Sequence, residues 1–135
     1  MTRPDVLQTL PAGAAQMTGR CHCGAVQIRV TLANGMATAR RCDCSYCRRR
    51  GAIAVTARLA DLEITRGADS LTLYQWGTHT AKHWFCAICG IYTHHQRRSD
   101  PTEYGVNVAM LDGINPRDLG NVPWSDGINH PSDRP

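Results

Sequence analysis

The sequence predicts an all-β domain of short strands, and three observations support this fold class. Apolar and polar residues alternate from Val26 to Leu32, which is the period-two pattern of a half-buried strand. Other short apolar runs are bounded by Gly, Pro, Asp or Asn, as in small sandwiches and barrels. No segment has the apolar period of about 3.6 residues that a long amphipathic helix requires.

The first expected strand begins after Gly24 and ends before the Asn34-Gly35 turn. Residues Asp61–Glu63 fit either a helical turn or another strand, because so short a run has no decisive period. Five further strands are expected at Ile53–Arg58, Leu71–Trp76, Ala81–Phe85, Gly90–Thr93 and Tyr104–Met110.

The length of 135 residues predicts one domain with a single core. We expect residues 1–16 to form a loose N-terminal arm and residues 17–135 to form the domain, with a turn-rich tail after Leu111. Hydrophobic residues make up 42% of the chain, which argues against disorder. No apolar run approaches the roughly 18 residues of a membrane span, and the first residues lack the continuous apolar region of a signal peptide. We therefore expect a cytoplasmic protein with no membrane partner.

Seven cysteines are the most informative feature of the sequence. Their odd number and the lack of an apparent secretion signal argue against a disulfide framework, and their tight spacing favours metal binding. They form three clusters, namely Cys21 with Cys23, Cys42 with Cys44 and Cys47, and Cys86 with Cys89.

The first and third clusters share a feature that pairs them in one site. Cys23 and Cys89 are each followed by a glycine, which permits a positive φ and turns backbone N–H groups toward sulfur. Zinc favours four such ligands in a tetrahedron. We expect one closed structural Zn²⁺ site, formed by Cys21, Cys23, Cys86 and Cys89.

The middle cluster supplies three thiolates, and arginine instead of glycine follows Cys47. Three protein ligands and one exchangeable position are typical of a catalytic zinc, so we expect Cys42, Cys44 and Cys47 to hold a second, catalytic Zn²⁺. A substrate thiol could take the open position. Two alternatives remain open: a thioredoxin-like redox pair, or a closed second site completed by His22, His94 or His95.

Arginines surround the middle cluster, at Arg40, Arg41 and Arg48–Arg50. Seven thiolates and two Zn²⁺ ions would add three negative charges, which lowers the formal charge of +4 to about +1 and makes a nucleic-acid partner improbable. Arginine also binds carboxylates in a bidentate manner, so Arg48, Arg49 and Arg50 are candidates for a substrate carboxylate. Asp43 and Tyr46 are candidates for proton transfer.

Four motifs together resemble the glutathione-dependent formaldehyde-activating enzyme family, which also includes centromere-protein-V-like proteins. They are Gly19-x-Cys21-x-Cys23-Gly24, Cys42-x-Cys44-x-x-Cys47, Phe85-Cys86-x-x-Cys89-Gly90 and Gly105-Val-Asn107. The resemblance implies an Mss4-like β-tent fold and the same division into a structural and a catalytic zinc. It also implies a carbon–sulfur lyase that adds glutathione to formaldehyde and catalyses the reverse reaction.

Two principal functional hypotheses follow. The first is a zinc-dependent carbon–sulfur lyase acting on glutathione or a similar thiol and on formaldehyde or another small carbonyl, like an S-hydroxymethylglutathione synthase. The second is a zinc-stabilised binding module with two closed zinc sites and no catalysis. An open fourth position at the middle cluster separates them, and a redox or metal-buffering protein is a third hypothesis.

Overall fold

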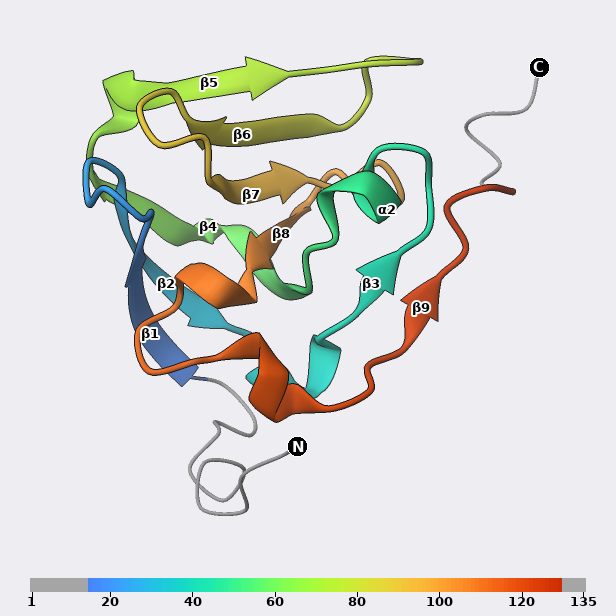
Figure 1. Ribbon diagram of the computed structural model, residues 1–135, viewed down its shortest axis with the longest axis horizontal. Helices are drawn as coiled ribbons and strands as arrows, with labels where there is room; N and C mark the ends of the chain where they lie inside the picture. Colours follow the sequence, from blue (N-terminus) through green and yellow to red (C-terminus); the bar gives the residue numbers. More distant parts are fainter. Residues whose placement is uncertain (1–14, 130–135) are drawn as a thin grey trace.

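The computed structural model describes residues 15–129, which form one large curved sheet beside a small one (Figure 1). Seven strands make up the large sheet, in the order β1-β2-β4-β8-β7-β6-β5, and every neighbouring pair is antiparallel. The all-β prediction is therefore confirmed. The strands are β1 (Ala15–Arg20), β2 (Gln27–Leu32), β4 (Ala54–Arg66), β5 (Leu71–Tyr74), β6 (Lys82–Cys86), β7 (Tyr92–Gln96) and β8 (Glu103–Asn107).

The second sheet pairs two short strands that are far apart in the sequence. β3 (Arg41–Cys42) and β9 (Trp124–Ser125) run parallel, with Arg41 opposite Trp124 and Cys42 opposite Ser125. Within residues 15–129 the only α-helix is the single turn α2 (Cys47–Arg50), and no helix there is long and apolar enough to cross a membrane. Short 3₁₀ turns cover Met36–Thr38, Ala68–Ser70, Val108–Met110 and Pro116–Leu119.

Strand β4 is longer than expected and lies at the bend of the large sheet. Its first residues, from Ala54, pair with β8, whereas its last residues, up to Arg66, pair with β2. The register breaks on the β2 side between Val30 and Leu32, so the strand changes direction there. Residues Asp61–Glu63, which the sequence left undecided, belong to this strand.

Several element boundaries differ from the sequence expectations. β1 begins at Ala15, inside the expected arm of residues 1–16, whose first fourteen residues lie outside the described part of the chain. β1, β3, β9 and α2 were not expected at all. The expected strand Tyr104–Met110 ends at Asn107, whose side chain accepts from Ala109 N and begins a 3₁₀ turn. That residues 17–135 form one domain stays a prediction.

The main core lies where β2, β4 and β8 pack their apolar faces against the turns that follow β8. It contains Ile28, Val30 and Leu32 of β2, all essentially inaccessible, in agreement with the alternating pattern. Val55, Ala57, Val106, Val108, Met110 and Leu111 complete most of its centre. A smaller cluster of Cys21, Val26 and Cys86 lies at the other end of the sheet. The first core packs the strands of the sheet together, and the second contains two of the seven cysteines, Cys21 and Cys86.

Gly19 shows how closely β1 approaches the segment after β8. A Cβ atom at this position would lie 2.5 Å from the carbonyl oxygen of Met110, which is backbone and cannot rotate away. Gly19 also forms an isolated bridge with Leu111. The residue must therefore be glycine for the strand to pack here.

We expect Gly19→Ala to destabilise the protein by about 1–3 kcal/mol, because the added methyl group forces β1 away from Met110. Thermal unfolding measures this. The control is Gln16→Ala on the exposed side of the same strand, which should unfold as the wild type does. Equal melting temperatures for the two variants would contradict the close contact.

Candidate metal centres

The first and third cysteine clusters meet in one group. The sulfurs of Cys21, Cys23, Cys86 and Cys89 all lie within 4.8 Å of one another. Cys23 Sγ is 3.7 Å from both Cys21 Sγ and Cys86 Sγ. A tetrahedral zinc with bonds of about 2.3 Å has sulfur–sulfur edges of about 3.8 Å. The spacing of these sulfurs therefore fits a four-thiolate zinc, and the predicted grouping is the one the fold produces.

The turns that carry these cysteines have the expected glycine conformations. Gly24 and Gly90 have φ values of 80° and 79°, a region that side-chain-bearing residues rarely adopt. The turns direct backbone N–H groups at sulfur, from Val26 to Cys21 Sγ at 3.3 Å and from Ile88 to Cys86 Sγ at 3.4 Å. Such hydrogen bonds stabilise thiolates in a metal site. Cys21 and Cys86 are buried, so the group is part of the smaller core.

The middle cluster forms a separate triad. Cys42 ends β3, Cys44 lies in the following loop and Cys47 begins α2, and their sulfurs lie within 4.8 Å of one another. The N–H group of Cys47 donates to Cys44 Sγ at 3.2 Å, and Arg50 Nη2 donates to Cys47 Sγ at 3.3 Å. Donors of the helical turn therefore contact two of the three sulfurs, those of Cys44 and Cys47.

No His, Asp or Glu of residues 15–129 joins this triad as a fourth ligand. Of the three histidines considered, His22 is exposed beside the other cysteine group. His94 stacks on Trp84 at 4.8 Å and does not line the cavity. His95 does line it, but its Nδ1 lies 2.6 Å from the Tyr92 hydroxyl. Among the described residues, the triad is an incomplete ligand set.

The three thiols of the triad already behave as one site. Hydrogen bonds with Cys42 and Cys47 lower the pKa of Cys44, whereas hydrogen bonds with Cys42 and Cys44 raise the pKa of Cys47. The ligands of a metal ion are thiolates, so each of these thiols must lose its proton when a metal binds. A divalent cation would replace those protons, which is how metal binding to thiols is coupled to proton release.

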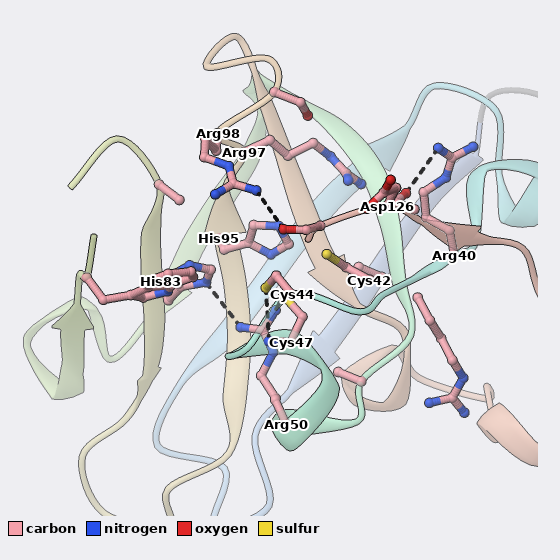
Figure 2. A pocket seen from close by; sticks show the side chains of 18 of the residues that line it. Arg40, Cys42, Cys44, Cys47, Arg50, His83, His95, Arg97, Arg98 and Asp126 are labelled. Carbon is pink, nitrogen blue, oxygen red and sulfur yellow. Dashed lines mark hydrogen bonds between the residues drawn. The ribbon is translucent and has the colours of Figure 1, made fainter. Parts of the chain in front are cut away.

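The triad lies at a cavity of about 290 Å³ (Figure 2). Arginines from distant parts of the chain dominate its charged lining, and two stacked imidazoles, His83 and His95, form part of its wall with ring centroids 5.2 Å apart. Asp126 is the acidic lining residue. The lining arginines are Arg40, Arg41, Arg50, Arg97 and Arg98.

The structure corrects the expected carboxylate ligands. Arg48 and Arg49 are exposed and do not line the cavity, and Arg49 Nη1 donates instead to the carbonyl of Ser45 at 2.6 Å. The sequence analysis placed them at the substrate because it did not predict the helical turn α2, which directs both side chains outward. Arg50 does line the cavity. The sequence analysis missed Arg97 and Arg98, which lie about 50 positions after Cys47. They reach this site only because β7, which precedes them, pairs with its neighbours in the large sheet.

Asp43 and Tyr46 do not line the cavity either, so the structure does not support their assignment to proton transfer. Asp43 Oδ1 accepts a hydrogen bond from Gly127 N at 2.8 Å and so anchors the tail. Tyr46 packs its ring on His83, with centroids 4.6 Å apart, and on Tyr74. Both residues position other parts of the site.

The tail closes over the triad at Gly127, which is buried. A Cβ atom there would lie 2.6 Å from Cys42 Sγ and 2.5 Å from Cys44 Cβ. Two cavity arginines hold this segment, since Arg98 Nη2 donates to Gly127 O at 3.5 Å and Arg40 Nη1 donates to Ser125 Oγ at 3.4 Å. Residues 125–127 of the turn-rich tail thus form one wall of the cavity.

The chain is similar to a known protein family and to a solved structure. A profile of the family described as glutathione-dependent formaldehyde-activating enzyme matches residues 16–122, a range that contains all three cysteine clusters. The chain is also similar to a Rhodobacter sphaeroides protein whose crystal structure was solved as a structural genomics target. Their sequence identity is 75%, the match covers 81% of this chain and 100% of that one, and the TM-score is 0.80.

The two cysteine groups should respond differently to substitution. We expect Cys89→Ser to abolish soluble folded protein or to lower the melting temperature strongly, because a structural zinc contributes on the order of 10 kcal/mol in small zinc domains. Cys44→Ser should keep the fold and remove only the metal of the triad. Thermal unfolding and zinc content per chain measure both effects. A Cys89→Ser protein that melts like the wild type would refute the role of the four-cysteine group.

Gly127→Ala should selectively disturb the triad. The added methyl group collides with Cys42 and Cys44, so the tail or the sulfurs must move, and we expect zinc content to fall by about one ion per chain while the fold is kept. Ile128→Ala, at the exposed neighbouring position, is the control and should retain both ions. Full zinc content in the Gly127 variant would show that the tail does not pack on the triad.

Proposed function

Because the chain belongs to the glutathione-dependent formaldehyde-activating enzyme family, we propose that it is a zinc-dependent carbon–sulfur lyase. It adds glutathione or a similar thiol to formaldehyde or another small carbonyl, and it catalyses the reverse reaction. The observation that carries this proposal is the incomplete triad of Cys42, Cys44 and Cys47 at an arginine-lined cavity. A closed site would have no position for a substrate sulfur.

We assign different roles to the two cysteine groups, one structural and one catalytic. Cys21, Cys23, Cys86 and Cys89 would hold a structural Zn²⁺, because four thiolates at tetrahedral spacing leave no position for substrate. The triad would hold the catalytic Zn²⁺, which lowers the pKa of a thiol in its open position. Thiolate sites of this kind persist in a reducing compartment, so we place the protein in the cytoplasm.

The charged wall of the cavity fits an anionic thiol. Arg40, Arg41, Arg97 and Arg98 can pair with carboxylates, and guanidinium groups do so in a bidentate manner. Asp126 can pair with an ammonium group. Glutathione carries two carboxylates and one ammonium group beside its thiol, so its charges match this lining. The cavity of about 290 Å³ suits a ligand of small size.

The alternative hypothesis, a binding module with two closed zinc sites, requires a different ligand set at the triad. It needs a fourth protein ligand at the triad, and none is present among residues 15–129. The five arginines line a cavity that also holds the cysteine triad, and Arg50 donates to Cys47 Sγ, so this lining favours a small anion over a nucleic-acid backbone.

Cobalt substitution tests the open position directly, because the absorption of Co²⁺ reports its ligands. We expect glutathione to convert the spectrum of the triad from three sulfur ligands to four and to leave the four-cysteine site unchanged. Cys44→Ser protein, which keeps only the structural site, is the control and should show no thiol response. An unchanged spectrum at saturating glutathione, in protein verified to hold two metal ions, would overturn the lyase proposal.

The arginine lining predicts which part of the thiol is recognised. Cysteamine, which has no carboxylate, should bind more weakly than glutathione in the same titration. Arg97→Ala should weaken glutathione binding by about 10-fold and leave cysteamine binding almost unaffected, since a charge-assisted hydrogen bond is lost. Arg97 is chosen because its side chain contacts Thr56 and Glu103 and not the tail. Arg48→Ala, an exposed arginine outside the cavity, is the matched control and should bind both thiols as the wild type does.

A further inference from the structure

His83 is a buried histidine that the sequence analysis did not assign to the chemistry. It lies on β6, its exposed fraction is 4%, and its ring lines the same cavity as the cysteine triad. Aromatic rings hold it on two sides, Tyr46 with centroids 4.6 Å apart and His95 with centroids 5.2 Å apart. The ring therefore has little freedom to turn.

The hydrogen-bond partner of His83 fixes which ring nitrogen carries the hydrogen. Arg50 Nη1 lies 3.2 Å from His83 Nδ1, and a guanidinium can only donate. Nδ1 must therefore accept, and in the neutral ring the hydrogen lies on Nε2. Within residues 15–129 His83 Nε2 forms no hydrogen bond. It is also not one of the fully buried side-chain nitrogen and oxygen atoms that lack a hydrogen-bond partner.

Arg50 is itself held rigidly. Its Nη2 donates to Cys47 Sγ at 3.3 Å, and its guanidinium lies 3.7 Å from the ring centroid of Tyr92 and 4.8 Å from that of Tyr46. One side chain thus connects the cysteine triad with His83. Figure 2 shows the two hydrogen bonds of Arg50, one with His83 and one with Cys47.

The surroundings also keep the His83 ring uncharged. Burial lowers the pKa of His83 to about 4, and the positive charges of Arg50 and Arg98 act in the same direction, whereas Cys44 acts against them. A neutral imidazole that presents an N–H group is a hydrogen-bond donor suited to a developing oxyanion, because it polarises a carbonyl without losing its proton.

We propose that His83 is a catalytic residue whose Nε2–H donates a hydrogen bond to the carbonyl oxygen of the small aldehyde, and that Arg50 is the residue that fixes this tautomer. The inference rests on the proposed lyase function and adds the group that activates the carbonyl. His95 is less suited, because its Nδ1 contacts the Tyr92 hydroxyl, a partner that can donate or accept.

Addition of the thiol to the aldehyde forms a C–S bond and breaks the π bond of the carbonyl group. The substrate thiol loses its proton to solvent and its thiolate sulfur gives an electron pair to the carbonyl carbon, which forms the C–S bond. The π electron pair of the C=O bond moves to oxygen, where the His83 N–H stabilises the charge. Oxygen then takes a proton from solvent, so overall the S–H hydrogen becomes the O–H hydrogen. The reverse sequence releases the aldehyde.

Nitrogen-detected NMR of the zinc-loaded protein without substrate tests the tautomer directly. We expect a protonated Nε2 and an unprotonated Nδ1 at neutral pH. Arg50→Met removes the donor to Nδ1, and it should bring the other tautomer into exchange. A wild-type ring that is protonated at Nδ1, or one that carries both protons, would overturn the proposal whatever the activity.

Kinetics then test the catalytic role, with the interconversion of glutathione, formaldehyde and their adduct followed by exchange NMR. His83→Phe should lower kcat by about 10²-fold, as the loss of an oxyanion donor does. His83→Gln, whose amide restores an N–H group, should recover part of that loss. Binding of glutathione to the cobalt-loaded variants should be unchanged, because the donor acts on the carbonyl and not on the thiol.

The matched control is His94→Phe, which replaces a buried histidine of β7 that does not line the cavity and should keep the wild-type kcat. If the wild type itself does not accelerate the exchange, the lyase proposal fails. If the wild type is active and folded His83→Phe protein keeps its kcat, only the assignment of His83 fails. A fall in kcat that His83→Gln does not relieve at all would also contradict it.

Discussion

The meeting of Cys23 with Cys86 is the constraint on which the rest of the structure depends. Cys23 lies in the turn before β2 and Cys86 ends β6, and these two strands are four positions apart in the large sheet. In a flat sheet they would be about 19 Å apart, since neighbouring strands are spaced by about 4.8 Å. Their sulfurs are 3.7 Å apart, so the sheet must curve strongly. Gly67 permits the accompanying backbone contact, because a Cβ there would overlap the carbonyl oxygen of Ala25.

The two cysteine groups show how neighbouring residues set the role of the same ligand. Glycine after Cys23 and Cys89 makes tight turns that enclose the sulfurs in backbone N–H groups. After Cys47 the chain continues as a helical turn, which places Arg50 against sulfur. The first arrangement brings together four thiol groups, the number of ligands that a tetrahedral zinc requires. The second leaves one side of the triad to the cavity, and a charged side chain stabilises the thiolate instead of a closed turn.

Sequence reasoning found the features that depend on nearby residues. The alternation of β2, the glycine turns and the division of the cysteines are local patterns, and each is present in the structure. It missed β3, β9 and the arginines after β7, because a two-residue strand has no period and its partner lies more than 80 positions away. The role proposed for His83 was missed for the same reason, since it depends on the hydrogen bond from Arg50, which is 33 positions away. Long-range packing determines these features, and no single segment encodes them.

Strand β6 joins the two centres mechanically. His83 faces the cavity near its start, and Cys86, three residues later at its end, belongs to the four-cysteine group. At about 3.3 Å per residue these positions are only about 10 Å apart along a rigid strand. A shift of Cys86 would move His83 relative to Arg50, and the 3.2 Å hydrogen bond that fixes its tautomer tolerates little displacement. The four-cysteine group therefore also influences the geometry of the cavity, because the strand that ends at Cys86 carries the proposed donor.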